Sequence, residues 1–168
     1  MSSENQQAEV ILVGCGAPLR GMGWYHAVQM LGKECPSAKL CYIIEPWFLG
    51  AGATGPGGPE FAEFKSKCET EHGVQFYTSL GDVPSVELEG GMKRLALISG
   101  RTADNPKLLS EAIAAGCKTV YLEKPGESCR LYPPSLSLLH LSNHAYFCRR
   151  TTLLISLSSP PPPFSHDI

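Results

Sequence analysis

The chain has 168 residues, a formal net charge of −2 and 43% hydrophobic residues. This length suits one domain with a buried core, and the near-neutral charge argues against nucleic acid or an acidic membrane surface as the partner. The seven cysteines form no C-x-x-C pair, so we expect reduced thiols in a cytoplasmic protein, without disulfides or a metal site.

Composition divides the chain into three segments. Residues 1–9 are polar and lack the apolar stretch of a signal peptide. Residues 10–128 carry the helix and strand patterns. Residues 129–168 are a low-complexity tail rich in Leu, Ser and Pro, interrupted too often by prolines, histidines and arginines to span a membrane. We therefore expect one folded domain followed by an irregular or disordered tail.

The first pattern is an apolar run at residues 10–13, which predicts a strand buried on both faces of a parallel sheet. Gly14 and Gly16 follow it, and Gly23 begins a helical apolar pattern. Strand, glycine turn and helix are the context of a dinucleotide-binding fingerprint. Gly14 would permit the tight turn, Gly16 the approach of a pyrophosphate, and Gly23 the close packing of the helix.

The spacing departs from G-x-G-x-x-G, because residues 17–22 make a longer loop than the pattern has. Arg20 in this loop would reach a phosphate. The alternative is that the glycines form only a flexible connection. Cys15 could be a reactive thiol near a helix N-terminus, but its place in the turn favours a small filler residue.

A second buried strand at residues 40–44 ends in Glu45 and completes a βαβ unit with a right-handed crossover. A carboxylate here binds the adenosine ribose and repels a 2′-phosphate, which favours NAD and leaves NADP as the second choice. Glu45 follows Gly16 by 29 residues, later than the usual spacing of about 20. The alternative is a solvated carboxylate at the end of the strand.

A glycine-rich stretch, residues 47–59, separates this strand from the next helix. It predicts a mobile surface loop, with contact of Trp47 or Phe48 with an adenine as a weaker alternative. Pro59 begins an amphipathic helix that Gly73 ends.

A polar loop at residues 100–105 follows the fourth predicted strand, at the edge where doubly wound sheets bind ligands. Arg101 and Thr102 in this loop are candidate cofactor contacts. Asn105 is the predicted N-cap of a helix that Gly116 ends. The third, fourth and fifth strands are predicted at residues 74–77, 94–99 and 119–122.

The fifth predicted strand runs into Glu123-Lys124-Pro125. A lysine at this edge can hold a substrate oxygen beside a nicotinamide and pass a proton as hydride moves. Pro125 restricts the backbone of Lys124 to extended geometry. The alternative is a surface ion pair of Glu123 with Lys124 or another neighbour.

Residues 10–128 resemble the N-terminal domain of the Gfo/Idh/MocA family, named after glucose–fructose oxidoreductase and inositol 2-dehydrogenase. The resemblance rests on Gly23-Trp24-Tyr25-His26, on Glu45, and on Glu123-Lys124-Pro125 preceded by Ala115-Gly116. It implies a Rossmann-like doubly wound parallel sheet with a nicotinamide dinucleotide bound in this domain. It places Lys124 at the nicotinamide and Glu123 among the cofactor contacts, and implies oxidation or reduction of a polyol, sugar or similar alcohol.

Two departures from the family qualify this expectation. The loop after the fourth strand reads Ser99-Gly100-Arg101-Thr102, where the family often has Thr-Pro-Asn. Residues 129–168 do not resemble the family's second domain, which supplies the substrate pocket and a catalytic histidine. We therefore expect a truncated domain, weakly active or inactive alone.

Two other interpretations remain. The chain could be a non-catalytic NAD(P)-sensing regulator whose proline-rich residues 159–164 bind a protein partner, or a domain in which the glycines are purely structural. In each case the fifth strand would have an open edge, which predicts poor solubility unless the tail or a partner covers it.

Overall fold

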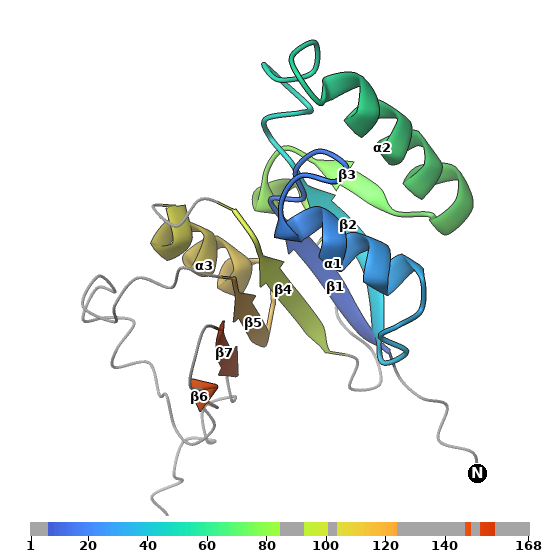
Figure 1. The fold of residues 1–168 in the computed structure, drawn as a ribbon. Helices are drawn as coiled ribbons and strands as arrows, with labels where there is room; N and C mark the ends of the chain where they lie inside the picture. The colour runs from blue at the N-terminus through green and yellow to red at the C-terminus, as the bar shows by residue number, and fades with distance from the viewer. Residues whose placement is uncertain (1–6, 85–92, 101–103, 124–146, 149–151, 157–168) are drawn as a thin grey trace, which may run out of the picture.

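The structure is a computed structural model that describes residues 7–84, 93–100, 104–123, 147–148 and 152–156 (Figure 1). Its centre is a parallel sheet in the strand order β3-β2-β1-β4-β5. The predicted Rossmann-like doubly wound α/β fold is therefore confirmed. The five strands are β1 (Ala8–Val13), β2 (Ala38–Ile44), β3 (Gln75–Tyr77), β4 (Arg94–Ile98) and β5 (Thr119–Leu122).

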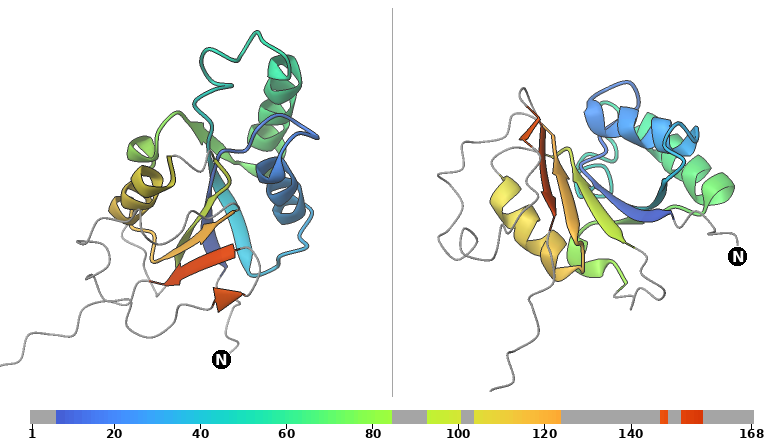
Figure 2. Two further views of the ribbon diagram at one scale, coloured as in Figure 1. Left: turned by 60° about the vertical axis from the view of Figure 1, so that its left-hand side comes forward. Right: turned by 90° about the horizontal axis from the view of Figure 1, so that it is seen from below.

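Helices cover both faces of this sheet (Figure 2). The helices α1 (Met22–Leu31) and α2 (Gly58–His72) lie on one face. The helix α3 (Asn105–Ala114) and the short 3-10 helix η1 (Leu80–Asp82) lie on the other. Of the described helices, none combines the length and the apolar surface that crossing a bilayer requires.

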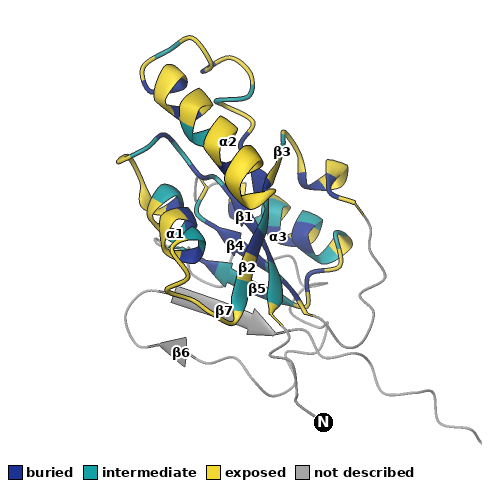
Figure 3. Ribbon diagram, turned by 90° about the vertical axis from the view of Figure 1, so that its right-hand side faces the viewer, coloured by how far each residue is buried: buried dark blue, intermediate teal, exposed yellow. Residues whose placement is uncertain are grey.

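The central strand β1 explains why its sequence is continuously apolar. Val10 and Leu12 pack in the core under α1 and α2, while Ile11 and Val13 pack in the core under α3. All four are at most 3% exposed. Figure 3 shows the buried strands between helices whose outer surfaces are exposed. Each such side chain contributes about 1.5–3 kcal/mol by its burial.

The segment expected to be an irregular tail contributes two further strands, β6 (Phe147–Cys148) and β7 (Thr152–Ser156). β7 pairs antiparallel with β5, and β6 pairs with β7, so that the described strands form one seven-stranded sheet. The chain itself therefore covers the edge of β5. The prediction of poor solubility applied only to an uncovered edge.

The helix ends follow the predicted glycines, with one correction. Gly73 has a left-handed backbone with φ of 67° at the C-terminus of α2, as expected. The N-cap of α3 is Asp104, not Asn105, and its side chain makes no capping hydrogen bond. Asn105 is the first helical residue and is buried, so the helix begins one residue before the position that Pro106 had suggested.

The glycine-rich stretch lies at the surface, as expected, but it packs closely at several points. A Cβ atom on Gly58 would overlap the carbonyl oxygen of Ala53, and one on Gly57 would lie 2.8 Å from the Cβ of Ala17. Phe48 stacks on Phe61 of α2, with ring centroids 5.1 Å apart. The loop is therefore attached both to α2 and to the turn that follows β1.

Candidate functional site

The turn after β1 has the backbone that its glycines predict. Gly14 and Gly16 have φ angles of 79° and 75°, a region that residues with a side chain rarely occupy. A Cβ on Gly14 would lie 2.7 Å from the Cα and N atoms of Gly100. The turn after β1 therefore touches the loop after β4, at the point where the strand order reverses.

Gly23 lets α1 begin directly on this turn. A Cβ on Gly23 would overlap the carbonyl oxygen of Gly14 and lie 2.8 Å from the Cα of Cys15. The N-cap residue of α1, Gly21, supplies no side-chain hydrogen bond to the first turn. The backbone N–H groups of that turn have no partner within the helix and suit an anion.

The longer loop before α1 closes on itself. The backbone N–H of Arg20 donates to the carbonyl oxygen of Ala17 at 3.0 Å, and Leu19 has a φ of 61°. Arg20 is exposed on this loop. A phosphate contact of its side chain remains a prediction.

Glu45 is the buried acidic residue of the site. It follows β2, is 6% exposed, and its Oε2 accepts a hydrogen bond from the backbone N–H of Gly16 at 2.8 Å. The interpretation of Glu45 as a solvated carboxylate is therefore wrong. A spacing of 29 residues, long for the fingerprint, still brings the carboxylate to the glycine turn.

A cavity of about 650 Å³ opens at the carboxyl ends of β1, β2 and β4. Gly14, Gly16 and Glu45 line it, so the structure brings three of the predicted residues to one place. Its other lining residues are Val13, Ile44, Pro46, Trp47, Thr78, Ser79, Leu80, Ser99, Gly100, Asp104, Lys107, Leu108 and Glu111.

The lining residues of α3 were missed by the sequence analysis. Lys107, Leu108 and Glu111 lie in the first turns of the helix that follows β4. The signal was available, because a helix after a parallel strand begins at the carboxyl edge of the sheet. Only the predicted loop before this helix, not the helix itself, was considered.

Glu123 contacts His26 of α1, whereas the alternative pair with Lys124 lies outside the described residues. Its Oε1 lies 2.6 Å from Nε2 of His26 on α1, and the hydroxyl of Tyr121 donates to the same oxygen at 3.3 Å. Both members of the His26–Glu123 pair are largely buried. The pair joins α1 to the carboxyl end of β5. His26 was quoted in the glycine motif without a role, and the motif alone could not identify its partner.

Three predicted residues, Arg101, Thr102 and Lys124, lie outside the described residues. Their roles remain predictions. The last described residue before Lys124 is Glu123, whose carboxylate contacts His26 of α1.

Cys15 is a filler residue of the turn. It is 1% exposed, and burial raises the pKa of its thiol, with a further increase from the negative charge of Glu45. The thiol therefore stays protonated and unreactive at neutral pH. Within the part of the chain that the structure describes, no cluster of three or more His, Cys, Asp or Glu side chains could hold a metal ion.

The chain resembles known proteins only weakly. No family model matches the chain, and no curated protein matches it. A solved myo-inositol 2-dehydrogenase from Lactobacillus plantarum is 19% identical, with a TM-score of 0.47 over 73% of this chain. An oxidoreductase from Agrobacterium radiobacter, solved with NAD+, L-tartaric acid and magnesium, is 17% identical, with a TM-score of 0.41 over 73% of this chain.

The chain spans only 30% and 29% of the length of these two proteins. With both TM-scores below 0.5, neither likeness carries weight for function. The strand order and the helices on both faces of the sheet identify this chain as a Rossmann-like α/β domain.

Proposed function

We propose that this chain binds a nicotinamide dinucleotide, NAD in preference to NADP, at the carboxyl edge of its sheet. The observation that carries the proposal is the hydrogen bond from Gly16 to Glu45 at the cavity. It places a glycine turn suited to a diphosphate beside a carboxylate suited to a ribose diol.

The residues present fit such a ligand. Gly14 and Gly23 leave no room for a side chain between the turn and its neighbours, which keeps the start of α1 and the loop after β4 close to the turn. The cavity of about 650 Å³ lies within the range of small-molecule and cofactor sites. In this proposal residues 10–128 are the dinucleotide-binding domain, and residues 152–156 of the predicted tail add β7 to its sheet.

We further propose that the domain belongs to an oxidoreductase acting on a polyol, sugar or similar alcohol. The support is the pair of motifs at Gly23–His26 and Glu123–Pro125, which the contact between His26 and Glu123 brings together. The nicotinamide would supply hydride transfer when bound. Lys124 would hold the substrate oxygen and take its proton as the alcohol is oxidised.

Calorimetric titration with NAD and NADP tests the binding proposal. We expect saturation with both and tighter binding of NAD. In Glu45→Ser the preference for NAD should narrow about tenfold, since the charge that repels a 2′-phosphate is gone. Glu63→Ser, on the exposed surface of α2, is the matched control and should keep the preference.

The outcomes separate the possible functions. A flat titration with both nucleotides would contradict the binding proposal and leave the glycines with a purely structural role. Binding with an unchanged preference in Glu45→Ser would remove Glu45 from the ribose contact. Hydride transfer from a panel of polyols to NAD, lost in Lys124→Ala, would support the oxidoreductase. Binding of NAD without turnover would favour a regulator.

A further inference from the structure

Trp47 is a large aromatic residue that the fold leaves exposed at the edge of the cavity. It follows Glu45 by two residues, lines the cavity and is 60% exposed. Leaving an indole in water forgoes the stabilisation that its burial would give. Its position beside an open cavity therefore points to a ligand contact.

The backbone of Trp47 is held in place. Its carbonyl oxygen accepts hydrogen bonds from the N–H groups of Gly50, at 3.1 Å, and of Gly52, at 2.8 Å. Gly52 is buried, and a Cβ on it would overlap the indole ring of Trp47 at three atoms. The indole therefore packs directly against the backbone of Gly52, which no other residue type would allow.

The loop that carries Trp47 is in turn fixed to its surroundings. Phe48 stacks on Phe61 of α2, and Gly57 packs closely against Ala17 in the loop that follows the glycine turn. The indole is thus fixed relative to Glu45 and the glycine turn before any ligand arrives. An aromatic surface that is already ordered loses little entropy when a flat ring stacks on it.

We propose that Trp47 is the surface on which the adenine ring of the dinucleotide stacks, with Gly52 as the seat of its indole. This inference rests on the proposed function. If Glu45 binds the adenosine ribose, the base attached to that ribose lies next to the residues that follow Glu45. Leu108, from the helix after β4, supplies apolar surface on the other side of β1, in the same cavity.

Titration with the two halves of the dinucleotide tests this assignment. The chain contains two tryptophans, so in Trp24→Phe the fluorescence reports Trp47 alone. We expect AMP to quench this fluorescence. By calorimetry, Trp47→Ala should weaken AMP and NAD about tenfold, because stacking on an aromatic side chain is lost. Trp47→Phe should restore most of the affinity for AMP and NAD. Nicotinamide mononucleotide should bind equally to the wild type, Trp47→Ala and Trp47→Phe.

A pair of glycine variants tests the seat. Gly52→Ala should displace the indole and weaken AMP, whereas Gly55→Ala should not, since a Cβ at Gly55 makes only an ordinary contact at 3.5 Å. Wild-type affinity for AMP in Trp47→Ala would overturn the inference while leaving NAD binding intact. If the wild-type protein binds neither AMP nor NAD, the proposed function is overturned as well. An equal loss of nicotinamide mononucleotide in Trp47→Ala would also contradict the inference.

Discussion

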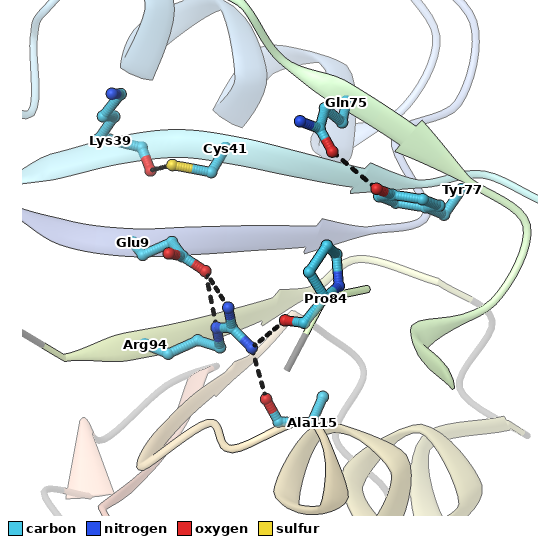
Figure 4. Close-up of polar contacts among 8 residues, drawn as sticks. All are labelled: Glu9, Lys39, Cys41, Gln75, Tyr77, Pro84, Arg94 and Ala115. Atoms are coloured by element: carbon cyan, nitrogen blue, oxygen red, sulfur yellow. Dashed lines mark hydrogen bonds and ion pairs between the residues drawn. The ribbon is translucent and has the colours of Figure 1, made fainter. Parts of the chain in front are cut away.

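The two ends of the sheet each bury a charged side chain, but they use it differently. At the amino end Arg94, 1% exposed at the start of β4, lies against Glu9 of β1, with Nε to Oε1 at 2.7 Å (Figure 4). Its Nη1 donates to the carbonyl oxygens of Ala115, at 2.8 Å, and Pro84, at 3.2 Å. At the carboxyl end Glu45 accepts a hydrogen bond from Gly16 and borders the cavity.

The comparison teaches that burial of a charge does not by itself identify a functional site. The guanidinium of Arg94 is enclosed by a carboxylate and two carbonyl oxygens, so its charge stabilises the amino end of the sheet. A carboxylate can accept about four hydrogen bonds, and the one from Gly16 occupies Oε2 of Glu45. Glu45 can therefore accept further hydrogen bonds, and it lies next to the cavity. Of the two buried charges, it is the candidate for binding a ligand.

The largest effect on stability is expected from removing the guanidinium of Arg94 at the amino end of the sheet. Arg94→Met should lower the free energy of unfolding by about 3–5 kcal/mol, because Glu9 and two carbonyl groups lose a buried partner. Urea unfolding measures the loss, and the double variant with Glu9→Gln should recover part of it. The folded fraction should bind NAD as the wild type does. A loss of NAD affinity without a loss of stability would contradict the division between the two ends.

A smaller loss of stability, with loss of binding, is expected at the carboxyl end. Gly23→Ala should cost about 1–3 kcal/mol, because its Cβ overlaps the carbonyl oxygen of Gly14 and forces α1 away from the turn. NAD affinity, measured by calorimetry, should fall more than tenfold. Gly81→Ala, where a Cβ meets only the Ser79 hydroxyl at 3.5 Å, is the matched control. Unchanged NAD affinity in Gly23→Ala would exclude the start of α1 from the site.

The smallest effect is expected in alkali. It comes from the ionisation of two buried thiols, Cys117 at the amino end of the sheet and Cys15 at the carboxyl end. Burial raises the pKa of Cys117 to about 11, with Arg94 lowering it and Glu9 raising it. Burial also raises the pKa of Cys15, and Glu45 raises it further. Both thiols are near their ordinary pKa of 9.0 when unfolded. Since the folded pKa is the higher one, the stabilisation is complete below pH 9 and is lost as the pH rises.

Urea unfolding between pH 8 and pH 12 measures this loss. The decline in the free energy of unfolding should be shallower in Cys117→Ala and in Cys15→Ala than in the wild type. Above about pH 11 the contribution of Cys117 should level off, while that of Cys15 continues to fall. Equal slopes in all three proteins would show that neither thiol is as buried in solution as in the structure.

Much of the fold could be predicted because its determinants are local. The apolar run of β1, the bounds of β5 at residues 119–122 and the end of α2 at Gly73 each follow from side-chain periodicity or from one residue's backbone freedom. The position of Glu45 at a strand end was predictable for the same reason. The start of α3 was displaced by one residue, which is within the usual variation of helix ends.

By itself, the sequence determined the strands, the helices and the glycines that the turns need, because these depend on neighbours along the chain. Only the tertiary structure decided which distant groups meet: Glu45 with Gly16, and His26 with Glu123 across 97 residues. The seat of Trp47 on Gly52 and the pairing of β7 with β5 belong to the same class. Such contacts depend on strand order and on the path of loops, and short-range periodicity carries no record of either.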